Sequence, residues 1–573
     1  MNLIVKKKRL SKLLALLVIL FIIYNASVSA QTAITTNPAY TTVTNPTPGT
    51  YNIEAAVGNT PVNSSDGRTL IINRLTDFTI QAGDTANILL NGSDTSINVI
   101  SGAGGVNIGG ILNSRTGAAA SPIGGNMVLV SPNGIIVGAG GQINAGSILL
   151  TTSNQSILPL SPGFAANADL NNPVDDANIR IQGIDASGIA RFINLTTDIT
   201  IAGDVNSLNP TPVFQSTVSP IMGNGYGIYM FGRSIDLQPG SSVATNTQAD
   251  IFLCTSNEVR WNFTNYTIAP YVALANRGDI QVQGTVTAPS GYINVQTDTN
   301  DILSNVINIT GQLNADAIVP NERGGFITLR NNSAASPWIV VDGVAGDGHI
   351  YARGDGSGRG GSLTIMPTGS FRALNGGTID LRNGPAGTTG GGFAIQSHIG
   401  VITRVGGVFL DPVTIASITL ADAAARGSFL VYNSGVTPDM EVVGTINFPA
   451  NSGVLLQPLI GNLNFNNGVN PITIDGTFTA IADNINVNGV INTTNGEIRL
   501  LSRAGVIDIA AGSSLNTVAG HDIVMSRRDT LGTLTVNAAG ILSAGGGANN
   551  VIIGNTTLND FTRTNRTLNG PTF

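Results

Sequence analysis

The sequence is poor in the residues that build crosslinks and metal centres. Cys254 is the single cysteine, which excludes an intramolecular disulfide, so stability must come from burial and backbone hydrogen bonding. Because it follows Ile251-Phe252-Leu253, we interpret Cys254 as a small buried hydrophobe. The three histidines, at positions 349, 398 and 521, have no second histidine or cysteine at metal-ligand spacing, and we therefore expect neither a zinc site nor a cofactor.

Charge is also scarce, at 11% of residues against 42% hydrophobic residues. Lysine occurs only at positions 6, 7, 8 and 12, so removal of residues 1–30, which also hold Arg9, leaves 22 of the 27 basic residues. Set against 34 acidic residues, these give a net charge of −12. So acidic a chain is unsuited to tracking phosphates, and we expect no nucleic-acid partner. The low charge also argues against disorder.

Residues 1–30 have the pattern of a secretory signal peptide. The basic residues precede an apolar core from Leu13 to Tyr24, and small residues lead to a cleavage site between Ala30 and Gln31. A membrane anchor is the alternative, but an apolar core of ~12 residues is short for a ~30 Å bilayer. We therefore predict export beyond the inner membrane, by way of the periplasm.

A short phrase recurs through the rest of the chain: glycine, a variable residue, an aliphatic, a polar residue and an aliphatic. Its period of two places the aliphatics on one face of a strand and the polar residues on the other. Copies occur at Gly291–Val295, Gly325–Leu329, Gly361–Ile365, Gly377–Leu381 and Gly496–Leu500.

Short alternating strands without helical spacing leave a sandwich, a propeller or a solenoid. The phrases recur every 16 to 36 residues, which we interpret as one or two coils of about twenty residues each. The sequence thus predicts an all-β protein, a right-handed parallel β-helix of about 25 coils and ~120 Å. Residues 31–64 are expected to form a leader or cap, and residues 166–573 the shaft. The 71 glycines are accounted for by bends between sheets.

Two segments interrupt this rhythm and are candidates for loops or an excursion from the helix. Pro210 to Gly225 is rich in proline, and Asn257 to Ala275 contains Trp261, Tyr266 and Tyr271. Loops on a scaffold are where binding is often placed.

The stretch from Gly124 to Thr152 is the most informative. Two apolar runs, Met127–Val130 and Ile135–Val137, are separated by Ser131-Pro132-Asn133-Gly134, and a third follows at Ile148–Leu150. Proline fixes the first corner of a turn and Asn-Gly tolerates positive φ, so the stretch predicts strand, tight turn and strand.

This block resembles the NPNG-I-x-x-G motif of the haemagglutination-activity domain of filamentous-haemagglutinin-type exoproteins, the substrates of two-partner secretion. Ser131 stands at the first asparagine of that motif. The lead-in Asn73–Ile80 with Ala82–Asn87, the exit Gly141–Ile148 and the aromatic Phe164 also resemble the family, over residues 65–165. The resemblance implies a β-helix and recognition of residues 65–165, with Ser131, Pro132, Asn133, Gly134 and Ile135 as the secretion motif, by an outer-membrane transporter.

Other motifs carry weaker signals. Arg353-Gly354-Asp355 is a possible adhesion motif, or else a solvated turn, and the glycine-rich segment around it lacks the repeated aspartate of calcium-binding nonapeptides. A carbohydrate-active β-helix enzyme, a lyase or glycosidase, would need carboxylates or basic groups on an outward strand face. The acidic residues Asp175-Asp176 and Asp298 with Asp301 fall at expected turns instead.

The sequence therefore predicts a secreted or surface-displayed, non-catalytic exoprotein. We expect a monomeric rod, adhesin-like, that binds a host-cell or bacterial surface receptor or glycan. A carbohydrate-active enzyme is the alternative, and a contact-dependent toxin carrier a third possibility.

Overall fold

The computed structural model describes residues 32–380 and 461–555 apart from short gaps, and between them only isolated strands. Residues 1–31, with the predicted signal peptide and the cleavage site at Ala30 and Gln31, lie outside the described part. The gaps are residues 66, 162–166, 186, 209–225, 247, 263–267, 273–277, 299–304, 332–337, 343–348, 357–359, 367–370, 375–377, 475, 519, 529–532 and 546–550.

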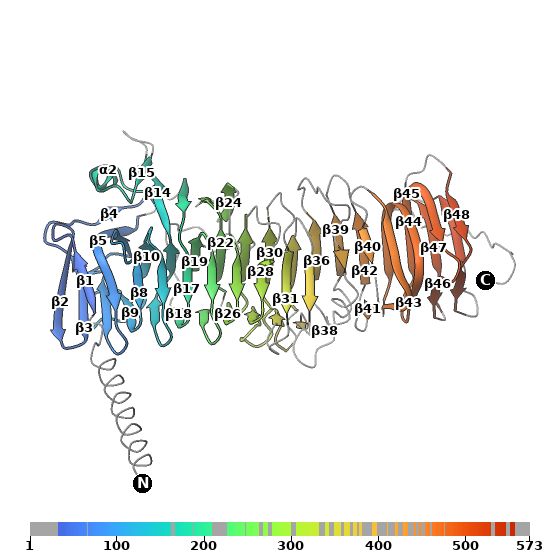
Figure 1. Cartoon of the computed structure of the whole chain (residues 1–573), viewed down its shortest axis with the longest axis horizontal. Helices are drawn as coiled ribbons and strands as arrows, with labels where there is room; N and C mark the ends of the chain where they lie inside the picture. The colour runs from blue at the N-terminus through green and yellow to red at the C-terminus, as the bar shows by residue number, and fades with distance from the viewer. Residues whose placement is uncertain are drawn as a thin grey trace, which may run out of the picture.

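The chain winds into a long column of parallel strands, a parallel β-helix (Figure 1). Its strand pairings define three faces. On face 1, sixteen strands pair in parallel from one coil to the next. They are β5 (Thr69–Ile80), β7 (Thr95–Ile100), β10 (Asn126–Val130), β13 (Ile148–Thr151), β19 (Gly227–Gly232), β22 (Asp250–Thr255), β27 (Tyr292–Thr297), β30 (Phe326–Asn331), β33 (Ser362–Met366), β36 (Gly392–Ser397), β39 (Ser428–Asn433), β42 (Gly453–Pro458), β44 (Phe478–Thr493), β45 (Ile498–Ile509), β47 (Ile523–Arg527) and β50 (Val551–Asn555).

Faces 2 and 3 are built in the same way, and the long strands β5, β44 and β45 bend from one face onto the next. Face 2 contains β8 (Val106–Ile108), β11 (Ile135–Val137), β17 (Ile199–Ile201), β20 (Ile235–Leu237), β25 (Ile280–Val282), β28 (Asn305–Ile309), β31 (Trp338–Asp342), β34 (Phe371–Leu374), β37 (Phe409–Leu410), β40 (Met440–Val442), β43 (Leu463–Ile474) and β48 (Thr535–Ala538). Face 3 contains β3 (Thr50–Ala55), β6 (Thr85–Leu89), β9 (Ile111–Arg115), β12 (Gln142–Ala145), β18 (Asp204–Ser207), β21 (Ser242–Thr245), β26 (Thr285–Thr287), β29 (Gln312–Asn314), β32 (His349–Tyr351), β35 (Thr378–Asp380), β38 (Thr419–Ala421), β41 (Ile446–Asn447), β46 (Ser514–Thr517) and β49 (Ile541–Ala544).

The interior is one continuous column of buried aliphatic side chains. Register keeps like residues stacked, as where Ile251 pairs with Ile293 and Ile293 with Ile327. A slip of one residue would turn every inward side chain outward, so the alternating phrase fixes this register. The predicted fold class, an all-β parallel β-helix, is confirmed.

The predicted size of the coils is wrong. One turn takes 20 residues between the paired Phe478 and Ile498, but 42 between Asp250 and Tyr292. The sixteen face 1 strands of the described residues, spaced by ~4.8 Å, span about 70 Å rather than the predicted ~120 Å. The corners between strands vary in length and show no sequence periodicity. The interval between the recurring phrases therefore did not give the number of residues in a coil.

Antiparallel strands close the N-terminal end of the column. β1 (Ala33–Thr36) and β4 (Val62–Asn63) pair with β5, and β2 (Thr41–Thr47) pairs with β3. A parallel stack would otherwise present open strand edges that invite association. The cap occupies all three edges of the first coil.

A second sheet lies outside the column, and we call it the side sheet. It is antiparallel, in the order β15 (Asn167–Asp169), β14 (Ser153–Pro159), β16 (Ile189–Leu195), β23 (Glu258–Asn262) and β24 (Ile268–Val272). The described residues of the predicted excursion, 258–262 and 268–272, lie in this sheet and confirm it, whereas residues 263–267 and 273–275 and the segment Pro210 to Gly225 lie outside the described residues.

The side sheet carries the short helices η1 (Pro173–Asp175) and α2 (Asp176–Gln182), which the sequence interpretation missed. Figure 1 shows them beside β4 and β5 at the capped end. Within the described residues no helix is long and apolar enough to cross a bilayer.

Candidate functional site

The Ser131–Gly134 turn joins β10 to β11 and is held between two neighbouring coils. The Gly134 amide donates to the Ser131 carbonyl at 3.2 Å, which closes the turn, and Gly134 adopts a φ of 102° that side-chain-bearing residues rarely adopt. On one side Asn133 Nδ2 donates to the Gly102 carbonyl at 2.9 Å. On the other side Thr197 Oγ1 donates to the Pro132 carbonyl at 2.7 Å. The motif residues therefore connect three successive coils by hydrogen bonds.

The turn is only partly exposed to solvent. Ser131 is completely buried, and its amide donates to the Thr151 carbonyl at 2.9 Å. Ile135 points into the core between Val106 and Ile199. Asn133 is exposed, and the next exposed apolar side chain is Ile136. A partner that reads this motif directly would thus contact Asn133 and its surroundings. Phe164 of the resemblance lies outside the described residues.

In the coils around this turn, the strands of face 1 are buried on both of their sides. Every residue of β7, β10, β19 and β22 is buried, because the outward side chains pack under the side sheet. Trp261 of β23 stacks on Tyr229 with ring centroids 4.5 Å apart, and Tyr229 stacks on Phe252 at 5.5 Å. Such aromatic pairs add to the stability gained from area burial. Cys254 lies in the same cluster, as predicted for a buried hydrophobe, and burial raises the pKa of its thiol.

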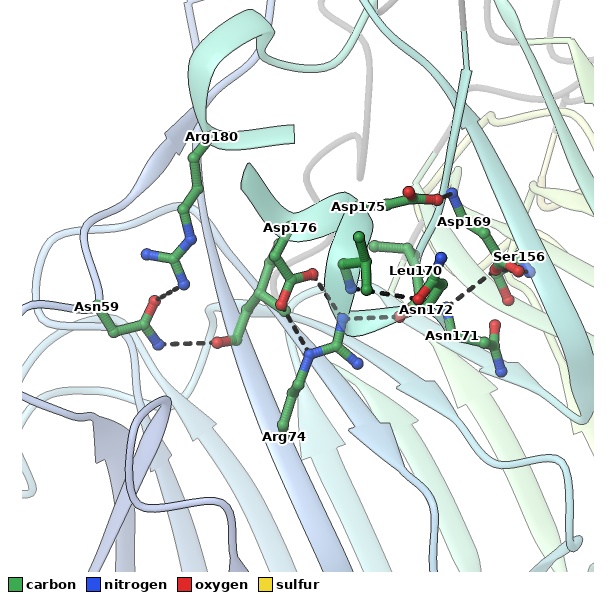
Figure 2. A network of polar contacts seen from close by, with 12 residues as sticks. Asn59, Arg74, Ser156, Asp169, Leu170, Asn171, Asn172, Asp175, Asp176 and Arg180 are labelled. Carbon is green, nitrogen blue, oxygen red and sulfur yellow. Dashed lines mark hydrogen bonds and ion pairs between the residues drawn. The ribbon is translucent and has the colours of Figure 1, made fainter. Parts of the chain in front are cut away.

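A buried ion pair fixes α2 to the first coil (Figure 2). Arg74 Nε donates to Asp176 Oδ2 at 2.8 Å and Arg74 Nη2 to Asp176 Oδ1 at 2.5 Å. Nη2 also donates to the Leu170 carbonyl at 3.1 Å. The two side chains are 8% and 4% exposed, so the pair is bidentate and desolvated. It joins residues 102 positions apart in the chain.

Further polar contacts hold the approach to α2, as Figure 2 also shows. Asp169 Oδ1 accepts from the Ser156 and Asn171 amides at 3.0 and 2.9 Å, and the Asp169 amide donates to Asp175 Oδ2 at 2.9 Å. Arg180 Nη2 donates to Asn59 Oδ1 at 2.6 Å. The segment that contains η1 and α2 is therefore tied both to β14 and to the loop that follows β3.

The side sheet has its own charged centre at Glu258. Arg191 and Arg260 each donate to Glu258 Oε1, at 2.8 and 2.9 Å. Burial of this carboxylate opposes its charged form, but the hydrogen bonds from the two guanidinium groups outweigh burial, and the pKa of Glu258 lies below its ordinary value.

Outward asparagines form a ladder along face 3. Asn113 Nδ2 donates to Asn87 Oδ1 at 3.2 Å, Asn144 Nδ2 to Asn113 Oδ1 at 3.0 Å, and Asn206 Nδ2 to Asn144 Oδ1 at 3.1 Å. Stacked side-chain amides repeat the backbone pattern of a parallel sheet and reinforce register. We conclude that the asparagines of this face stabilise the stack of coils.

The Arg353-Gly354-Asp355 triplet forms a corner after β32. Arg353 Nε and Nη2 donate to Asp316 Oδ2 at 3.0 and 2.6 Å, and the guanidinium lies over the Tyr351 ring at 4.5 Å. The Asp355 amide donates to the Glu322 carbonyl at 3.1 Å. The Arg353 side chain thus holds this corner in place. A receptor would have to displace Asp316 to bind the Arg353 guanidinium. The adhesion motif stays a prediction.

The structure describes three of the four acidic residues considered for catalysis. Asp175 and Asp176 accept the bonds described above, and Asp301 lies outside the described residues. Asp298 is 7% exposed, and burial raises its pKa. Across the described part of the chain, no three His, Cys, Asp or Glu side chains are grouped to hold a metal ion.

No family model and no curated protein matches the chain. Among solved structures it is similar to the crystal structure of the HMW1 secretion domain from Haemophilus influenzae, at 15% identity and a TM-score of 0.40, over 89% of this chain and 99% of that chain. A likeness of this degree carries no functional inference, so the function is inferred from the chain's own residues.

Proposed function

We propose that the protein is a β-helical exoprotein exported by two-partner secretion, with an adhesive or other interaction role and no catalysis of its own. In this proposal an outer-membrane transporter recognises the N-terminal unit that contains residues 65–165, and the column then stands at the cell surface or is released as a monomeric rod. Its ligand is a receptor or glycan on a host or bacterial surface.

The asymmetry of the column carries the proposal. Its N-terminal end is closed by antiparallel strands and its first coils are covered by the side sheet, whereas β30, beyond the side sheet, alternates buried and half-buried residues. The two parts therefore differ in what they present to a partner. The motifs that resemble the secretion family, including Ser131 to Ile135, fall in the capped and covered part.

The coil geometry suits export of an unfolded chain. A single coil such as residues 292–325 buries Ile293, Val295, Ile307, Ile309 and Leu313 against its neighbours. Each such side chain stabilises by ~1.5–3 kcal/mol on leaving water. Coils that form outside the membrane one after another would oppose backward sliding of the chain, and no nucleotide is needed. The single cysteine leaves no intramolecular crosslink to obstruct threading.

Export in the native cell tests the proposal. We expect deletion of residues 65–165 to leave the protein in the periplasm, measured by pulse-labelling and fractionation. Deletion of residues 478–555, which removes distal coils only, is the matched control and should allow export of a shorter chain. Normal export of the first variant would contradict the proposal. Binding of the purified rod to cells, with glycan cleavage measured in parallel, tests the adhesive and non-catalytic parts.

A further inference from the structure

The outward side of β27 and its continuation bury a carboxylate and an amide oxygen that have no partner. Asp298 is 7% exposed and Gln296 is 4% exposed. Among the described residues, the Asp298 side chain makes no hydrogen bond or ion pair, and Gln296 Oε1 is buried without a hydrogen-bond donor. Buried polar groups ordinarily have a partner, because a buried charge or acceptor without one costs free energy. The two groups therefore point to a ligand.

Gln296 and Asp298 are neighbours on the same side of the chain. Gln296 is an outward residue of β27, whose inward residues include Ile293 and Val295. The Asp298 amide donates to the Thr255 carbonyl at 3.0 Å, so the pairing of β27 with β22 continues to residue 298. The side chain of Asp298 thus keeps the alternation of the strand and lies on the outward side, one position beyond Gln296.

The electrostatics of Cys254 place the Asp298 carboxylate close to Gln296. Cys254 of β22 pairs with Gln296 in register. Burial raises the pKa of the Cys254 thiol, and the negative charge of Asp298 raises it further, so this charge lies beside the Cys254–Gln296 pair. Arg330, which pairs with Gln296 from β30, does not neutralise the carboxylate, because burial raises the pKa of Asp298 without an opposing effect.

The preceding outward residue, Asn294, adds a third oxygen without a partner. Asn294 Nδ2 donates to Tyr292 Oη at 3.1 Å, and Tyr292 Oη donates to Thr328 Oγ1 at 3.0 Å. These two bonds hold the amide nitrogen toward Tyr292, so Asn294 Oδ1 lies on the side away from that ring, where it is buried and accepts no hydrogen bond. Outward positions 294, 296 and 298 therefore form a row of oxygen acceptors that lack a donor among the described residues.

We propose that Gln296 and Asp298 bind a calcium ion, with water completing its coordination and Asn294 Oδ1 accepting a hydrogen bond from one of these waters. Carboxylate and amide oxygens are ligands of Ca²⁺, at about 2.3–2.6 Å. Outward positions of a strand recur every ~6.8 Å, a separation that a glutamine and an aspartate side chain can span to meet at one ion. The predicted net charge of −12 for the chain without residues 1–30 also favours cations near its surface.

The chemistry of the site favours Ca²⁺ over the other common divalent cations. Zn²⁺ prefers histidine or thiolate ligands, and burial keeps the neighbouring Cys254 in its thiol form. Mg²⁺ demands a near-ideal octahedron and releases its water reluctantly, whereas Ca²⁺ accepts irregular sets of oxygen ligands. The ion would bind where the side sheet ends, since the outward residues of β22 belong to the covered cluster and those of β30 are half-buried. Binding there stabilises the folded protein.

Calorimetric titration of CaCl₂ into the chelator-treated chain without residues 1–30 tests the proposal. We expect a site with a Kd of about 10⁻⁴–10⁻³ M, the range of extracellular calcium modules. Asp298→Asn should weaken binding at this site at least about tenfold, because it removes the charged ligand, and Gln296→Leu should weaken it to a smaller extent. Asp508→Asn makes the same change at an exposed position on β45 and is the matched control, with unchanged binding.

Loss of binding in Asp298→Asn will not reflect loss of folding. In chelator this variant should resist denaturant at least as well as the unmodified protein, because it no longer buries an unpaired charge. Unchanged fluorescence of Trp261, buried under the side sheet, provides a second check. Absence of Ca²⁺ binding by the unmodified protein overturns the proposal. Equal binding by Asp298→Asn, or MgCl₂ binding as tightly as CaCl₂ at this site, also overturns it.

Discussion

The substitution Asp176→Ala tests the role of the buried ion pair most sharply. It leaves the Arg74 guanidinium buried, with one hydrogen bond to the Leu170 carbonyl in place of three contacts. Removal of one partner of a buried pair costs about 3–5 kcal/mol, because the other charge stays desolvated and unpaired. At 1.36 kcal/mol per factor of ten, the segment it anchors should open about 10²- to 10⁴-fold more often.

Hydrogen exchange of the full chain, read by mass spectrometry, measures that opening locally, which suits a chain too large for two-state unfolding. Peptides from residues 167–183 should lose protection, while peptides from β44 and β45 should not change. The double substitution Arg74→Met/Asp176→Leu is the control, since apolar replacement of both partners is often neutral or stabilising. Equal protection of residues 167–183 in Asp176→Ala and the unmodified protein would refute the assigned role of the pair.

Three further predictions concern single sites. Gly105→Ala should destabilise the region around the Ser131–Gly134 turn by about 1–3 kcal/mol, because Gly105 has a φ of 65° and a Cβ there would lie 2.6 Å from the Gly134 carbonyl oxygen. Unchanged protection of β8 from hydrogen exchange would contradict this. The pKa of Glu258 is lowered in the folded state, so its contribution to stability is complete above the ordinary carboxyl pKa of about 4.3 and is lost as pH falls through the lower folded value. Trp261 fluorescence in a Trp338→Phe background should show this loss of stability. In Glu258→Gln this pH dependence should be absent. Arg353→Ala should loosen the corner at Asp316, whereas Asp355→Ala should not. If the triplet is used as an adhesion motif, both variants should instead lose cell binding to the same extent.

The alternating phrases were enough to predict strands, their inward faces and a stacked parallel helix. Inward aliphatics at every second position can be buried only when coils stack, so the fold class follows from local pattern. The same pattern gave no coil length, because the corner between β22 and β27 holds the side-sheet strands β23 and β24 as well as the next two strands of the column.

The helix α2 had a local signal that was overlooked. Asn172 caps η1 by accepting from the Val174 amide at 3.2 Å, Pro173 follows it, and Gly183 ends α2 with a φ of 74°. This order of cap, proline and glycine is a known helix signature. A helix of seven residues is too short to show a reliable apolar period, so periodicity alone did not reveal it.

The continuous apolar runs 127–130 and 251–254 lie in strands that are buried on both sides, as such runs do in covered sheets. Which element covers them was not readable from the sequence, because the contacts that hold the side sheet join residues such as Arg74 and Asp176 that are remote along the chain. Local sequence therefore determined the strands, the turn at Ser131–Gly134 and the need to stack. Tertiary structure decided that this turn is held between coils, that Arg353 is bound by Asp316, and that α2 buries Ile179 but exposes Ile181, since each outcome depends on which distant side chains meet.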